Sequence, residues 1–138
     1  MKRIVAIFLI LLLMLSFVGC DTAKIEVGSK NGVVYFHYPN RTPKITVNKG
    51  KEKLPVEDPA FFEKLVNCID GKPEQETPTY YPEYIYTVEI GKYDFALHEK
   101  HIFIYSPLGR NIKGVEIIIV ECTEEEISEL VELLDAVK

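Results

Sequence analysis

The sequence lacks the short motifs by which many enzymes are recognised. It has no Gly-rich loop of the kind that cradles phosphates. No Ser or Cys lies in a nucleophile elbow, and Cys68 falls on the apolar stripe of a predicted helix. The stretch HEKH at residues 98–101 is one residue shorter than the H-E-x-x-H zinc motif and falls in a predicted turn. The chain therefore offers no identifiable reaction, and we expect a protein that is not an enzyme.

Long hydrophobic runs are also scarce, since the chain has a single one, near its start. This run extends from Ile4 to Val18, is interrupted by Ser16, and follows the cations Lys2 and Arg3. It is shorter than the roughly 20 apolar residues that span a bilayer core comfortably. A basic start, a short apolar run and a small residue after it are typical of an export signal. We find no second run and no internal repeat, so one compact domain is expected after the signal.

The residues SFVGC at the end of the apolar run resemble the lipobox of bacterial lipoproteins. The resemblance implies that Gly19 precedes the cleavage site, and that Cys20 is lipidated and becomes the new N-terminus. Asp21 follows, and an Asp at this place is associated in Gram-negative lipoproteins with retention at the inner membrane, so the resemblance implies the outer face of the cytoplasmic membrane for either type of envelope. We expect a signal peptide at 1–19, a lipidated tether at 20–24 and one domain at 25–138. An ordinary signal peptide with an incidental cysteine, or an uncleaved anchor helix, is the alternative.

Positive charge is scarce over most of the chain. The formal net charge is −5; the signal contributes +2, so the mature chain carries −7. Residues 21–56 carry seven Lys or Arg against three acids, whereas residues 57–138 carry 18 acids against seven cations. The uneven charge is either ordinary solvated surface or a basic, membrane-proximal part that complements anionic headgroups. The overall acidity and the compartment argue against a nucleic-acid partner.

Cysteine is sparse, at three residues in the whole chain. With Cys20 assigned to lipid, Cys68 and Cys122 remain in a compartment that permits disulfides. Both fall on apolar faces of predicted elements, so they form either a disulfide or two separately buried thiols. A disulfide across so long a loop would stabilise the fold by about 4 kcal/mol if chain entropy alone is counted.

The strands predicted from the sequence begin with a hairpin. Residues 25–27 and 33–38 flank a turn at Asn31-Gly32, a pair that favours tight hairpins. A third strand is expected at 44–48, three more between 84 and 106, and a last one at 115–122.

Two helices are predicted between and after these strands. Asp58 is a good N-cap before a proline, and Gly71 ends the first helix. Thr123 and Glu126 form the capping box of the second helix. Helices separated by an antiparallel meander indicate an α+β fold, with a single antiparallel sheet, both helices on one face, and an N-terminal hairpin before it. This order of elements resembles the TATA-binding-like arrangement of small Firmicute lipoprotein domains of unknown function, which implies no activity.

The middle strands are predicted to have one apolar and one mixed face. A two-residue turn at 91–92 makes Ile90 face Tyr93 and Val88 face Phe95 on an apolar face that takes the helices. The N-terminal hairpin, a partner or a ligand must cover part of the opposite face. We call the opposite face the mixed face, and its members are Thr87, Glu89, Asp94, Ala96, His98, His101, Phe103 and Tyr105.

The mixed face is the candidate binding surface. Phe103 and Tyr105 are the expected anchors, because aromatic residues commonly carry interface energy. His98 and His101 lie opposite each other beside them. We therefore expect a non-catalytic binding module of the cell envelope, without a cofactor, that contacts membrane lipid through Cys20. Its partner would be an envelope protein, a peptide or a cell-wall glycan.

A pair of tyrosines in the proline-punctuated connection at 71–83 is a second candidate. Tyr80 and Tyr81 belong to an aromatic run that continues with Tyr84 and Tyr86, and exposed tyrosine beside proline suits contact with a peptide or a glycan. The simpler interpretation is that Tyr84 and Tyr86 belong to the core of a strand and that Tyr80 and Tyr81 cover it.

Two alternatives to a binding module remain open. A hydrolase could use His98 and His101 to hold a metal with a third ligand, and Glu89 facing Asp94 as a carboxylate pair. The simpler interpretation is a surface histidine pair and two solvated acids, so we assign no metal site. The other alternative is a structural or inhibitory lipoprotein that blocks an enzyme by covering its surface.

Overall fold

The computed structural model describes residues 24–39, 41–78, 83–107 and 115–138. Among these residues no helix is long and apolar enough to cross a membrane. In chain order the elements are β1 (Glu26–Lys30), β2 (Val33–His37), β3 (Ile45–Lys49), β4 (Glu52–Pro55), α2 (Pro59–Ile69), β5 (Tyr86–Ile90), β6 (Tyr93–Leu97), β7 (His101–Pro107), β8 (Val115–Glu121) and α3 (Glu124–Asp135).

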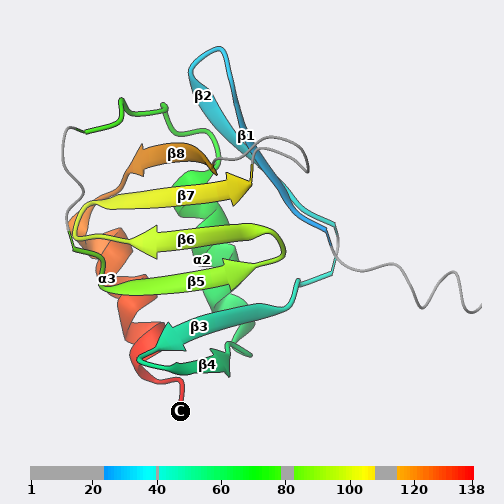
Figure 1. The fold of residues 1–138 in the computed structure, drawn as a ribbon, viewed down its shortest axis with the longest axis vertical. Coiled ribbons are helices and arrows are strands. Elements are labelled where there is room, and N and C mark those ends of the chain that lie inside the picture. Colours follow the sequence, from blue (N-terminus) through cyan, green and yellow to red (C-terminus); the bar gives the residue numbers. More distant parts are fainter. Residues whose placement is uncertain (1–23, 40, 79–82, 108–114) are drawn as a thin grey trace, which may run out of the picture.

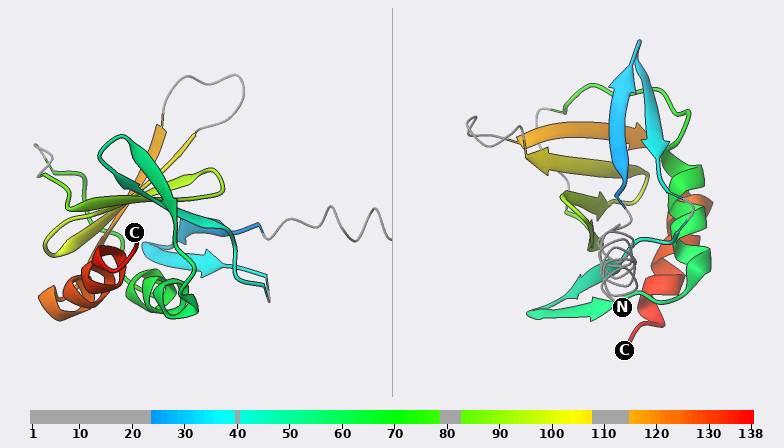
Figure 2. Two further views of the ribbon diagram at one scale, coloured as in Figure 1. Left: turned by 90° about the horizontal axis from the view of Figure 1, so that it is seen from below. Right: turned by 90° about the vertical axis from the view of Figure 1, so that its right-hand side faces the viewer.

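Six strands form one antiparallel sheet in the order β4-β3-β5-β6-β7-β8, and β1 and β2 form a separate hairpin. Both helices lie on the same face of the sheet (Figures 1 and 2). The α+β fold predicted from the sequence is therefore confirmed. The helix boundaries follow the predicted signals: Asp58 accepts a hydrogen bond from the Ala60 backbone at 3.0 Å, and Thr123 and Glu126 form the complete capping box.

The predicted strand register is also observed. Ile90 pairs with Tyr93 and Val88 with Phe95 across the β5–β6 turn, and Ala96 pairs with Phe103 across β6 and β7. The fully buried face of these strands packs against the apolar stripes of the helices, which contribute Phe61, Leu65, Ile69, Leu130 and Leu134. Because side chains alternate between faces, this register leaves the mixed face on the side without helices.

The hairpin lies on the helix side of the sheet, beside α2, and not over the mixed face (Figure 2). The Phe36 ring centroid lies 5.8 Å from that of Phe62 in α2 and 5.9 Å from that of Phe95 on the helix-facing side of the sheet. The C-terminal end of α2 holds the edge of β2, because the Val34 N–H donates to the Lys72 carbonyl and the Phe36 N–H to the Asp70 carboxylate. The expectation that the hairpin could cover the mixed face is wrong, because its apolar side chains complete the main core instead.

One strand was not predicted from the sequence. Residues 52–55 form β4, which pairs with β3 at the edge of the sheet. Its sequence, EKLP, has two charges and a proline, and only Leu54 packs against the core. Such residues are typical of protected edge strands rather than of buried ones.

Candidate functional site

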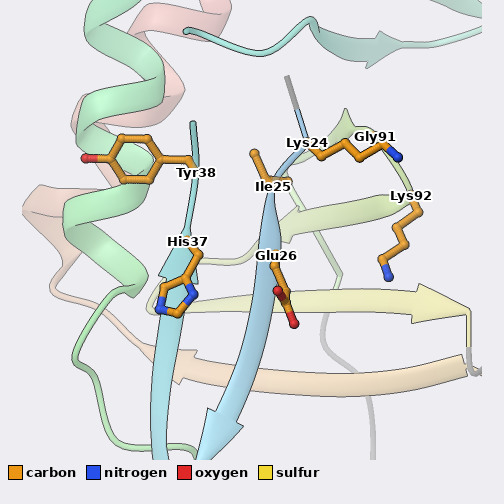
Figure 3. Close-up of a pocket in the computed structure, with 7 residues that line it drawn as sticks. All are labelled: Lys24, Ile25, Glu26, His37, Tyr38, Gly91 and Lys92. Atoms are coloured by element: carbon orange, nitrogen blue, oxygen red, sulfur yellow. The ribbon is translucent and has the colours of Figure 1, made fainter. Parts of the chain in front are cut away.

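A cleft of about 700 Å³ opens where the described chain enters the domain. Its walls come from three segments that are distant in sequence: the start of β1, the end of β2, and the β5–β6 turn (Figure 3). The lining residues are Lys24, Ile25, Glu26, His37, Tyr38, Gly91 and Lys92.

Tyr93 fixes the position of β1 beside the β5–β6 turn. Its hydroxyl accepts a hydrogen bond from the Val27 N–H at 3.1 Å and donates to the Val27 carbonyl at 3.4 Å. Both contacts are buried. On the outer edge of β1, the hydroxyl therefore supplies the hydrogen-bond partners that a neighbouring strand would otherwise supply to the Val27 backbone. Gly91 adopts a φ of +59°, which allows the adjacent two-residue turn to close. The cleft is therefore built by long-range contacts and not by a local motif.

The cleft carries more positive than negative charge. Lys24 extends toward Gly91, and the Lys92 Nζ lies 5.3 Å from the centroid of the Tyr93 ring (Figure 3). Glu26 is the one acid among the lining residues. Tyr38 is 53% exposed and adds a large amphipathic side chain. The Tyr38 ring points away from the two lysines, toward Phe62 of α2 (Figure 3), so the two ammonium groups alone suit the binding of an anionic group.

The mixed face does not present Phe103 to solvent. Phe103 is 2% exposed and forms a small second core with Ala96 and Ile119, against which Tyr105 and Ile117 pack. Tyr105 is only partly buried. Of the two predicted anchors, Tyr105 therefore keeps some accessible surface, whereas Phe103 acts as packing.

The two predicted histidines differ in environment. His98 is 3% exposed, its Nδ1 lies 3.0 Å from the Glu83 carbonyl, and its ring centroid lies 4.3 Å from that of Phe103. With Nδ1 donating to that carbonyl, Nε2 is a buried acceptor that finds no hydrogen-bond partner among the residues that the structure describes. Burial lowers the pKa of His98, so the ring is held neutral. His101 is partly exposed at the start of β7.

The two predicted carboxylates lie opposite each other, as the register requires. Glu89 pairs with Asp94, and the Lys53 Nζ lies 3.1 Å from the Glu89 carboxylate. Partial burial is the main reason that the pKa of Asp94 is raised, and the negative charge of the nearby Glu89 raises it further. Asp94 lies four residues from His98 along β6, about 13 Å at the usual rise of a strand. The structure therefore separates the acid pair from the histidine pair, and the described residues contain no group of three His, Cys, Asp or Glu side chains that could hold a metal.

The structure brings together the two cysteines of the domain as free thiols. Both are buried, and the Cys122 Sγ lies 3.5 Å from the Cys68 carbonyl oxygen. The contact with Cys122, and then burial, raises the pKa of the Cys68 thiol. The pair joins the end of α2 to the residue after β8, so it lies in the core and outside the cleft. Cys20, Tyr80 and Tyr81 lie outside the described residues.

A second exposed feature lies at the opposite end of the sheet. Tyr84 and Ile85 are 63% and 48% exposed just before β5. Ile85 also lines a hollow of about 200 Å³ with Glu99 and Glu124, beside the β6–β7 turn. We call this region the distal end, because β6 separates it from the cleft. The sequence offers Tyr84 as one of four candidate tyrosines or as strand core, and the structure places it exposed before β5, next to Ile85, which the sequence did not single out.

No protein-family model, no curated protein and no solved structure matches this chain.

Proposed function

We propose that the protein is a lipoprotein of the bacterial cell envelope that acts as a non-catalytic binding module. In this proposal residues 1–19 direct export and are removed, and Cys20 carries the lipid that holds the domain at the extracytoplasmic face of the membrane. The observation that carries the proposal is SFVGC, placed directly after a basic start and a short apolar run.

The layout of the domain supports this proposal. Lys24, the first residue that the structure describes, lies four positions after Cys20, so a lipid there would hold one end of the domain close to the membrane. Tyr84 and Ile85 lie at the other end, where they would be accessible to a partner. Exposed Tyr beside an aliphatic residue is typical of protein contact surfaces. The partner we propose is an envelope protein, a peptide or a cell-wall glycan.

Replacement of the lipid acceptor tests the anchor. Wild-type protein should partition into the detergent phase after phase separation of cell lysates, and it should take up labelled fatty acid. Cys20→Ser should remain an unlipidated precursor. Appearance of Cys20→Ser at mature size, with unchanged partition and labelling, would remove the basis of the lipoprotein assignment.

Site-specific crosslinking tests the binding surface. A photoreactive residue at position 84 should trap the same partner repeatedly in intact cells, whereas one at position 33 should not. Val33 is a suitable control because it is also exposed, at 46%, but lies on the hairpin. Equal crosslinking from both positions, or none from position 84, would contradict a partner surface at the distal end.

The hydrolase alternative makes a different prediction. If His98 and His101 held a catalytic metal, zinc added to purified protein without a His tag should raise its melting temperature. We expect no such rise, because His98 is buried and its Nδ1 contacts the Glu83 carbonyl. A rise that His101→Ala abolishes would favour the hydrolase.

A further inference from the structure

The length of the proposed tether limits how the domain can sit on a membrane. Lys24 lies four positions after Cys20, and a fully extended chain spans about 3.5 Å per position, or about 14 Å in all. A lipidated Cys20 would therefore keep Lys24 and the cleft within that distance of the headgroups. The rest of the domain extends away from this point, since β1 begins at the end of the sheet that carries the β5–β6 turn (Figure 1).

Further cations lie at the same end as the cleft. Ile45 pairs with Ile90, so Lys44 lies beside the β5–β6 turn that carries Lys92. Arg41 and Lys44 are both exposed in the connection between β2 and β3, which runs close to the start of β1 (Figures 1 and 2). We call this region the anchor end, and its exposed cations are Lys24, Arg41, Lys44 and Lys92.

Acidic residues at the same end balance this charge outside the cleft. Glu57 and Asp58 follow Val56, whose N–H donates to the Ile45 carbonyl, and Glu89 and Asp94 flank the β5–β6 turn. Inside the cleft, Lys24 and Lys92 face a single acid, Glu26, so the small excess of positive charge is local to the cleft. At the distal end the exposed side chains include Glu83, Glu99, Glu121, Glu124 and Glu125 together with the cations Lys51 and Lys100, of which Lys100 lies 3.5 Å from Glu124. The excess of positive charge at the anchor end is therefore confined to the cleft itself.

We propose that the anchor end docks on anionic phospholipid, with headgroup phosphates entering the cleft between Lys24 and Lys92. This inference rests on the proposed lipidation of Cys20, which brings the cleft to the bilayer. Basic residues next to an anchor are attracted to anionic headgroups, and the attraction decays within a Debye length, about 8 Å at physiological salt. Tyr38 would lie at the headgroup level, which suits its apolar ring and polar hydroxyl. The docked domain would present Tyr84 and Ile85 away from the membrane.

A single tryptophan can report this contact, because the natural chain has none. The lipidated full chain carrying Tyr38→Trp is reconstituted into phosphatidylcholine vesicles with brominated acyl chains, with or without phosphatidylglycerol. The matched control is Tyr84→Trp, which replaces a tyrosine that is also more than half exposed, at the distal end. We expect quenching and a blue shift for Tyr38→Trp when phosphatidylglycerol is present, and neither change for Tyr84→Trp.

Charge reversal tests the role of the lysines. Lys24→Glu with Lys92→Glu, in the Tyr38→Trp background, should reduce quenching in anionic vesicles to its level in neutral vesicles. Lys51→Glu with Lys100→Glu changes the net charge equally at exposed positions away from the cleft and should leave quenching unchanged.

The outcomes separate this inference from the proposed function. Protein that is not lipidated and does not stay with the vesicles contradicts the anchor itself. Protein that is lipidated and vesicle-bound, but shows equal emission at positions 38 and 84, overturns docking alone. Quenching at position 38 that is the same with and without phosphatidylglycerol overturns the role of anionic lipid.

Discussion

At the scale of single residues, Phe103 decides what the mixed face contributes. Its side chain is 2% exposed, so Phe103→Ala should lower the free energy of unfolding by about 3–5 kcal/mol. Urea melts of wild type and variant measure the difference. Val33→Ala removes an exposed side chain and should change stability by no more than about 0.5 kcal/mol. A loss of less than about 1 kcal/mol for Phe103→Ala would restore the open binding face that the sequence predicts.

His98 gives the domain a pH dependence with a definite sign. Burial lowers its folded-state pKa below the value of about 6.5 in an unfolded chain. The unfolded chain therefore takes up the proton first, and stability should fall as the pH drops below about 6.5 toward the folded pKa. In urea melts from pH 7.5 to 5, His98→Gln should lose less stability than wild type. The exposed His37 supplies the control, since His37→Gln should follow the wild-type curve. Identical curves for all three proteins would contradict a buried, neutral His98.

At the scale of elements, one hydroxyl links the hairpin to the sheet. Tyr93→Phe keeps the buried ring but leaves the Val27 N–H without its partner, which should cost about 1–3 kcal/mol. Hydrogen exchange at β1 should accelerate more than exchange at β6. Tyr38→Phe removes an exposed hydroxyl and should change neither quantity. Unchanged exchange at β1 in Tyr93→Phe would show that other contacts hold the hairpin.

The contact between Cys68 and Cys122 predicts that the two thiols can form a disulfide, which would link α2 to the residue after β8. On refolding with a glutathione redox pair, the domain should lose two hydrogens and both free thiols. The oxidised form should be more stable than the reduced form by about 4 kcal/mol, because the two residues are far apart in the chain. The variant carrying Cys68→Ser should be insensitive to reductant. Two alkylatable thiols after unfolding of the oxidised sample would contradict the pairing.

The elements differ in how far the sequence determines them. The strands β5 to β8 and both helices follow from tight turns, caps and apolar periodicity, which are all local signals. The strand β4 escapes prediction because EKLP is polar and short, and it forms only by pairing with β3. The side on which the hairpin packs is also not encoded locally. Val27, Val34 and Phe36 require an apolar surface, and the sequence does not say which of two such surfaces they meet.

At the scale of the whole molecule, the candidate site is a consequence of tertiary structure. The cleft joins residues 24–26, 37–38 and 91–92, so neither spacing nor composition could predict it. The sequence does contain two lysines that could have drawn attention to the cleft. Lys24 lies next to the proposed anchor, and Lys92 lies in a predicted turn. The folded domain then has a basic cleft at the end where the chain begins and exposed Tyr84 and Ile85 at the other. This polarity is what a binding module held at a membrane surface requires.

The mass of the mature N-terminus tests the central proposal most directly. Protein isolated from membranes of its native host is digested, and the N-terminal peptide is analysed by mass spectrometry. The proposal predicts a peptide that begins at Cys20 and carries a diacylglyceryl group on its sulfur, with residues 1–19 absent. A peptide that begins at Met1, or one that contains Cys20 as an unmodified thiol, would contradict it.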